Sequence, residues 1–228
     1  MMRIDLQLFG GRGSGSGAGP GLPSGGGGGG AGGAILGTEE LVTQRGAKEA
    51  EVDEVLTVTR AFRDQYGNDV VPEELQVADI ANGAVMAYYD SMGNLAINRT
   101  YFNDTKMTSA YDDAVKDGFH PSRGNKTAME ATAAHEMGHR LADVATQRAI
   151  SASSFSDGKI ERKIVENAAK KINANGALGV AKQISGYAQK SYSECIAEAV
   201  ADVYCNGSKA SKASTAVVNE LNKVLRRK

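Results

Sequence analysis

Two histidines and a glutamate fall within about one helical turn in the segment His135-Glu136-Met137-Gly138-His139. Residues four positions apart in an α-helix lie on one face, so both imidazoles can face a single ion. In this H-E-x-x-H pattern two neutral imidazoles bind Zn²⁺, and the glutamate acts as general base toward a metal-bound water. The alternative is a solvated helix face with two ordinary polar residues, but a chain with only three histidines rarely shows this spacing by chance. The motif therefore predicts a zinc site.

A second group of acids lies in residues 191–202, for which a helix is predicted. Glu194, Glu198 and Asp202 follow one another at intervals of four and share one face, where a nearby cation would relieve their mutual repulsion. A catalytic zinc needs a third protein ligand, and its histidines need acceptors that hold their tautomers. Glu194 can be the ligand with Glu198 orienting a histidine, or Glu198 can be the ligand with Asp202 behind it. Helix geometry alone does not separate these two registers.

Tyr187, Glu194 and Glu198, preceded by the H-E-x-G-H motif, resemble the corresponding region of anthrax toxin lethal factor and of the Pro-Pro endopeptidases. Those proteins are zincin metallopeptidases, and the resemblance covers roughly residues 84–205. It implies one role for each of six residues: His135, His139 and Glu194 as Zn²⁺ ligands, Glu136 as base, Glu198 as the acceptor that orients a ligand histidine, and Tyr187 as hydroxyl donor to the developing oxyanion.

Some features depart from that pattern or leave a role open. The interval from His139 to Glu194 is long, and Asp202 is an acid that the pattern does not require. Tyr192 is the substitute if Tyr187 is only a packing residue. The third histidine, His120, precedes a proline in a predicted loop, which is typical of a surface or turn residue; a role as ligand or proton donor is the alternative.

The elements that must position these residues are mostly helical. A helical pattern begins at Thr38, with a possible break at Gly46, and ends before Pro72. A hairpin is predicted from strands 84–90 and 95–102, and by the resemblance 95–102 is an edge strand that pairs with an extended substrate. A loop over 103–126 leads to the motif helix, predicted from a capping box at Thr127 and Glu130 to about Gln147. After a loop at 151–158, further helices are expected at 159–173, 191–202 and 211–228. The fold class is therefore α+β: a mostly helical, zincin-like metallopeptidase domain with a small antiparallel sheet.

Residues 1–37 are expected to be a disordered, Gly-rich leader before a single domain at 38–228. Residues 10–37 contain 16 of the chain's 28 glycines, and such a stretch has too little apolar surface to offset its chain entropy. The first 17 residues resemble the leader of phage and prophage head-morphogenesis and minor capsid proteins. This resemblance implies phage head or portal proteins as partners, and a location in the virion or the host cytoplasm.

Composition argues against several other classes. The net charge of −1 gives no reason to expect nucleic acid or an anionic membrane as partner. No apolar run is long enough to span a bilayer and no secretory signal is apparent, so a soluble protein is expected. Cys195 and Cys205 lie about 15 Å apart along one predicted helix, which is too far for a disulfide.

Together these observations predict a zinc-dependent endopeptidase that acts on a peptide or protein substrate and is encoded by a phage or prophage. The alternative is a non-catalytic virion protein whose zinc site only stabilises its fold.

Overall fold

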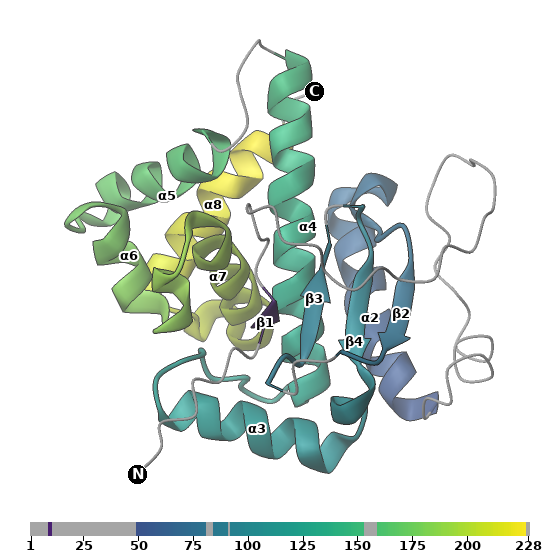
Figure 1. The fold of residues 1–228 in the computed structure, drawn as a ribbon. Coiled ribbons are helices and arrows are strands. Elements are labelled where there is room, and N and C mark those ends of the chain that lie inside the picture. The colour runs from purple at the N-terminus through teal and green to yellow at the C-terminus, as the bar shows by residue number, and fades with distance from the viewer. Residues whose placement is uncertain (1–8, 11–48, 81–83, 91, 153–158, 227–228) are drawn as a thin grey trace.

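The computed structural model describes residues 9–10, 49–80, 84–90, 92–152 and 159–226. These residues form a mostly helical α+β fold in which a small sheet lies to one side of the long helix α4 (Ala128–Ala152) (Figure 1). The elements are, in chain order, β1 (Phe9–Gly10), α2 (Glu49–Tyr66), η1 (Asn68–Val70), β2 (Leu75–Ala78), β3 (Ala87–Tyr89), β4 (Leu95–Asn98), η2 (Arg99–Tyr101), α3 (Asp104–Lys116), α4 (Ala128–Ala152), α5 (Lys159–Ile172), α6 (Gly176–Ile184), η3 (Tyr187–Gln189), α7 (Tyr192–Asn206), η4 (Gly207–Lys209) and α8 (Lys212–Leu225).

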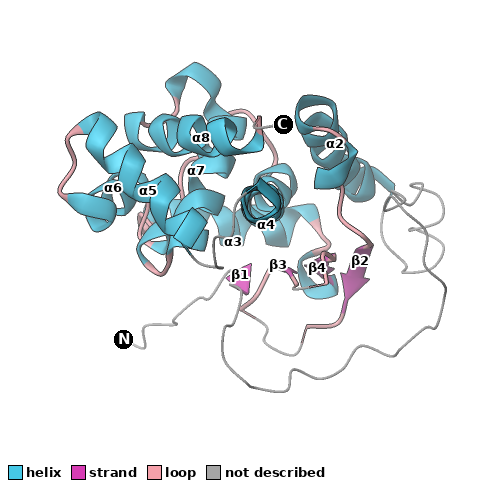
Figure 2. Ribbon diagram, turned by 90° about the horizontal axis from the view of Figure 1, so that it is seen from above, coloured by secondary structure: helices cyan, strands magenta, loops and turns pink. Residues whose placement is uncertain are grey.

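Helix α4 is the centre of the fold. Seen end-on in Figure 2, it lies between the strands on one side and α7 and α8 on another, with α2 close by. All residues from 128 to 145 are buried except Glu130, which is half-buried. A helix that is covered on all sides needs small or apolar side chains on nearly every face, which explains the many alanines of α4. The buried polar side chains that remain on it therefore need partners from the surrounding helices.

The capping box predicted for this helix is confirmed. The Glu130 backbone N–H donates to the Thr127 hydroxyl at 3.1 Å, and the Thr127 N–H donates to the Glu130 carboxylate at 2.9 Å. These reciprocal bonds satisfy two N–H groups that have no partner inside the helix. Helix α4 ends at Ala152, beyond the predicted end at Gln147 and inside the loop predicted for 151–158; residues 153–158 lie outside the described residues.

The predicted hairpin is confirmed: β3 and β4 pair antiparallel, with Tyr89 opposite Leu95. The prediction of a purely antiparallel sheet is wrong, because β2 pairs parallel with β4, and β1 pairs parallel with β3. The strand order β1-β3-β4-β2 also places β4 inside the sheet. The prediction that 95–102 is an edge strand is therefore wrong, and its last part forms the 3₁₀ turn η2 instead. The unexpected neighbour of β4 is the buried strand β2, which follows Pro72.

The loop predicted for 103–126 contains helix α3, so that prediction is also wrong over the first half of the segment. The Asn103 side chain caps the helix by accepting from the Lys106 N–H at 3.2 Å. Met107, Tyr111 and Ala114 are buried at intervals of four and three residues, which is the spacing of one helix face. The sequence thus contained both a cap and a helical period in this segment.

The predicted helices in the C-terminal half are present as α5, α7 and α8, and α6 and η3 lie between α5 and α7 in a stretch for which no element was predicted. Cys195 is buried and Cys205 half-buried, and both are free thiols, as predicted. Among the described residues, no helix is both long and apolar enough to cross a membrane.

The prediction for residues 1–37 lies largely outside the described residues. It differs from the structure at Phe9–Gly10, which form β1 against the outer edge of β3. An edge strand presents unpaired backbone groups that a further segment can pair with.

Candidate metal centre

The two motif histidines lie one turn apart on α4, on the side that faces α7. Their ring centroids are 5.0 Å apart. Gly138 between them allows α7 to come close, because a Cβ atom at this position would lie only 2.6 Å from the Ala197 Cα atom. Real side chains do not tolerate such a distance, so only glycine permits this approach of the two helices.

Helix α7 carries the acid that meets both histidines. The Glu194 Oε2 atom lies 3.2 Å from the His135 Nε2 atom and 3.4 Å from the His139 Nε2 atom. Ser191 caps the helix by accepting from the Glu194 N–H, which fixes the turn that carries this glutamate. His135, His139 and Glu194 are buried and can together hold a metal ion.

The opposite ring nitrogens of the histidines have their own partners. The His135 Nδ1 atom lies 2.8 Å from the Glu198 Oε1 atom, and the His139 Nδ1 atom lies 2.8 Å from the Ser193 hydroxyl. An ionised carboxylate only accepts, so His135 donates from Nδ1, and Nε2 is the nitrogen that can give up its proton and bind a metal. This is the tautomer that a metal ligand requires, and it is set by the hydrogen bond on the far side of the ring. Ser193 was missed in the sequence analysis, because a serine one residue before an acid has no distinguishing pattern.

The two glutamates therefore occupy different positions. Glu194 faces the Nε2 atoms, whereas Glu198 faces an Nδ1 atom and also accepts from the Ser185 hydroxyl at 2.7 Å. The alternative register, with Asp202 behind a Glu198 ligand, is not the arrangement observed. Asp202 instead accepts from the Asn206 side chain at 2.8 Å and from the Ser211 N–H at 3.0 Å, at the start of α8. It thereby joins α7 to α8.

Charge compensation inside the site is strong. Burial would lower the pKa of His135, but the carboxylates of Glu194 and Glu198 raise it to about 10. Burial would likewise raise the pKa of Glu194, but the two imidazoles hold it well below its usual range. Without a metal, the imidazoles therefore act as the countercharge for the acids.

Glu136 lies beside these groups but makes no comparable contacts. The side chain is fully buried, and neither of its oxygens makes a hydrogen bond of normal geometry to any of the residues that the structure describes. Burial raises its pKa to about 7, although the two motif histidines and the Tyr89 backbone N–H act against this. A carboxyl group with such a pKa can accept and release a proton near neutral pH.

Tyr187 lies next to the metal centre, in η3. Its ring is buried, with its centroid 5.9 Å from that of His135 and 5.0 Å from that of Phe119. Its predicted role as oxyanion donor stays a prediction. Its substitute, Tyr192, is the first residue of α7 and is more than one third exposed.

His120 is the residue for which the sequence interpretation was wrong. It was expected at the surface or in a turn, but it is only 3% exposed, and its Nδ1 atom lies 2.9 Å from the Glu198 Oε1 atom. The backbone of its loop pairs with the start of η3, since Tyr187 N–H donates to Phe119 O at 3.0 Å. All three histidines of the chain thus lie close together. The small number of histidines was the one signal in the sequence that could have indicated a site role for His120.

Comparisons of the chain with protein-family models, with curated proteins and with solved structures found no match.

Proposed function

We propose that the protein is a zinc-dependent endopeptidase with a zincin-like site, in which His135, His139 and Glu194 hold the metal. The observation that carries this proposal is the spacing of the three donor atoms. Tetrahedral Zn²⁺ with ligand bonds of about 2.0–2.2 Å separates its donors by about 3.3–3.6 Å. The Glu194 Oε2 atom lies 3.2 and 3.4 Å from the two Nε2 atoms, which is long for a hydrogen bond but close to the zinc spacing.

The surrounding residues also fit a metal. The Nε2 atom of His139 and the Oε2 atom of Glu194 are buried without a hydrogen-bond partner among the described residues, although buried polar atoms normally have one. A bound cation would satisfy both atoms. Two histidines and one carboxylate are a common donor set of catalytic zinc, which leaves a position open for water or substrate.

Each residue can be given a role in peptide hydrolysis. Bound Zn²⁺ would supply Lewis-acid polarisation of the scissile carbonyl and a lowered pKa for the attacking water. Glu136 would take the proton from this water and pass it to the leaving amine, for which its pKa of about 7 is suited. Glu198 would hold His135 in the required tautomer, and Tyr187 would donate a hydrogen bond to the developing oxyanion.

The resemblance to anthrax toxin lethal factor and the Pro-Pro endopeptidases supports the same roles. The leader motif within residues 1–17 supports a phage or prophage origin, with the leader binding head or portal proteins. In this proposal, peptides or proteins are the substrates, and the protein is associated with the virion or acts in the host cytoplasm.

A second candidate function is a non-catalytic virion protein with a zinc-stabilised fold. The burial of the site favours it, since His135, Glu136, His139 and Glu194 are at most 4% exposed. A substrate needs access to the metal, whereas a structural zinc is closed and usually has four protein ligands.

Zinc binding and hydroxamate binding together test the two candidates. We expect about one Zn²⁺ per chain by elemental analysis, and we expect a peptide hydroxamate to bind the zinc-loaded protein but not the metal-free protein. Zinc without hydroxamate binding would favour the structural role and contradict the peptidase. Iron in place of zinc would also contradict it, because two histidines and one carboxylate can hold non-haem iron as well.

The ligand assignment gives a separate prediction. Glu194→Ala removes a donor to the metal and should weaken zinc binding by more than about 100-fold, whereas Glu198→Ala removes only the acceptor behind His135 and should weaken it by about 10- to 100-fold. Glu166→Ala is the control, because Glu166 pairs with Arg162 on α5 and has no contact with the site. Competition with a chromogenic chelator measures all three affinities. The reverse order of effects would assign Glu198 as the ligand.

A further inference from the structure

The carboxylate of Glu198 is shared by three side chains from different parts of the chain. Its Oε1 atom lies 2.8 Å from the His135 Nδ1 atom and 2.9 Å from the His120 Nδ1 atom, and its Oε2 atom accepts from the Ser185 hydroxyl at 2.7 Å. A carboxylate is an acceptor for all three of these groups, so both imidazoles donate to it from Nδ1.

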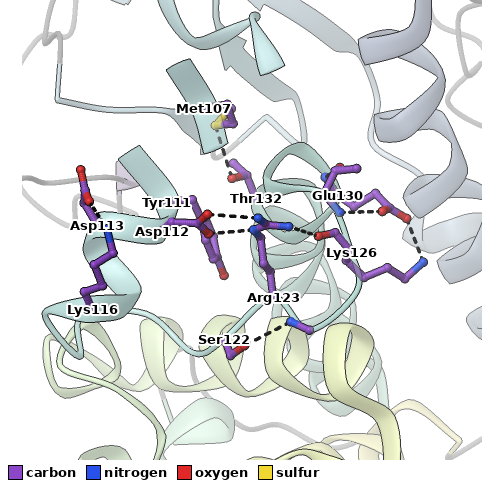
Figure 3. A network of polar contacts seen from close by, with 12 residues as sticks. Met107, Tyr111, Asp112, Asp113, Lys116, Ser122, Arg123, Lys126, Glu130 and Thr132 are labelled. Carbon is purple, nitrogen blue, oxygen red and sulfur yellow. Dashed lines mark hydrogen bonds and ion pairs between the residues drawn. The ribbon is translucent and has the colours of Figure 1, made fainter. Parts of the chain in front are cut away.

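The segment that follows His120 is held to the neighbouring helix by Arg123 (Figure 3). The Arg123 side chain donates to both carboxylate oxygens of Asp112 on α3, at 2.8 and 3.1 Å, and to the Lys126 carbonyl before α4 at 2.6 Å. These bonds tie the segment that follows His120 to α3 and close its turn before α4. The backbone next to His120 is therefore fixed by contacts that lie outside the metal site.

Aromatic rings enclose the imidazole of His120. It stacks on Tyr111 at 5.6 Å between centroids, and the rings of Phe119 and Tyr187 pack at 5.1 and 5.4 Å with their planes steeply inclined to it. In such an apolar enclosure a hydrogen bond to a charged acceptor is strong, because water does not compete for it.

We infer that His120 is a positioning residue of the metal centre: it holds the Glu198 carboxylate in the orientation that fixes His135 with its Nε2 atom toward the metal. This inference rests on the proposed function. It follows from the shared oxygen atom, since the His120 bond adds a second donor to the same Oε1 atom that accepts from His135. Removing a group that touches a metal ligand, as Glu198 does, typically changes metal affinity by about 10- to 100-fold, so the effect of His120, which acts through Glu198, should lie at or below the lower end of this range.

The competing explanation is that His120 only fills space between the aromatic rings. Two substitutions separate the explanations. The amide nitrogen of His120→Asn can take the place of Nδ1 and donate to Glu198, but this variant lacks the ring. His120→Phe keeps a ring of similar size between Tyr111 and Tyr187 but cannot donate. Tyr111→Phe is the matched control, since it removes only a hydroxyl that donates to the Pro121 carbonyl at 3.3 Å.

The experiment measures the zinc dissociation constant of the full-length variants by chelator competition, and the unfolding temperature of each metal-free protein. We expect His120→Phe to bind zinc about 10-fold more weakly than wild type, and His120→Asn and Tyr111→Phe to remain within about threefold of it. The order of the unfolding temperatures should differ from the order of the affinities, because the Asn variant loses the packing and the Phe variant keeps it.

Wild-type affinity in His120→Phe, or equal weakening in the Asn and Phe variants, would overturn the inference. Neither result would affect the proposed function, which depends on the wild-type protein binding zinc and cleaving peptides. If the wild-type protein fails to bind zinc, it is the proposed function that fails.

Discussion

Glu136→Gln should bind zinc with the affinity of the wild-type protein and fail to cleave any peptide that the wild-type protein cleaves. Glutamine has nearly the same shape as glutamate, and Glu136 makes no ion pair or normal hydrogen bond with the described residues that the change would break. The variant cannot accept a proton from water, and loss of a general base typically lowers the rate by about 10²- to 10⁴-fold. Proteomic identification of peptides cleaved by the two proteins would measure the difference and reveal the substrate at the same time.

Glu166→Gln makes the same chemical change on α5 and should leave cleavage unaltered. If Glu136→Gln cleaves as fast as wild type, the proposed mechanism is wrong. If it also loses zinc, Glu136 contributes to the site in a way that the mechanism does not include.

Gly138→Ala should both destabilise the protein and weaken zinc binding. The new methyl carbon would lie 2.6 Å from the Ala197 Cα atom, and backbone atoms cannot yield as a flexible side chain does. Overpacking of this kind costs about 1–3 kcal/mol, more than the roughly 0.5–1 kcal/mol gained by replacing glycine in a helix. The helices would have to separate, which would move Glu194 away from the histidines. Thermal unfolding and chelator competition measure the two effects, and we expect zinc affinity to fall by at least about tenfold.

Gly179→Ala is a matched control, because its Cβ atom on α6 would meet its nearest neighbours at 3.5 Å, an ordinary contact distance. It should raise the free energy of unfolding by about 0.5–1 kcal/mol and leave zinc binding unchanged. A Gly138→Ala protein that is as stable as Gly179→Ala would show that α4 and α7 are not in the close contact described.

The sequence predicts the parts of this fold that depend on local interactions. The capping box at Thr127 and Glu130 and the hairpin around 84–102 each involve residues close together in the chain, and both are confirmed. The pairing of β2 with β4 joins strands about twenty residues apart, so no local pattern reveals it. Helix α3 was missed although Asn103 offers a cap, because its apolar stripe is interrupted by many polar residues.

The candidate site likewise contains residues that local spacing predicts and residues whose place depends on distant parts of the chain. The spacing of His135 and His139 places both on one helix face whatever lies around them. The choice between Glu194 and Glu198 depends on how α7 is rotated and shifted along α4, and the contact at Gly138 sets this arrangement. His120 could not be assigned, since its position depends on a loop that folds against α7 over a separation of 78 residues.

The burial of so many charged and polar groups between α4 and α7 has a consequence for the energetics of the whole chain. Buried ion pairs gain little net stability, because each charge loses its hydration, so the metal-free protein gives up stability to maintain this site. A ligand that binds only the folded state adds stability in proportion to the logarithm of its concentration over its dissociation constant. In the proposed function the metal would be such a ligand, so the folded chain should persist longer when the ion is supplied than when it is withheld.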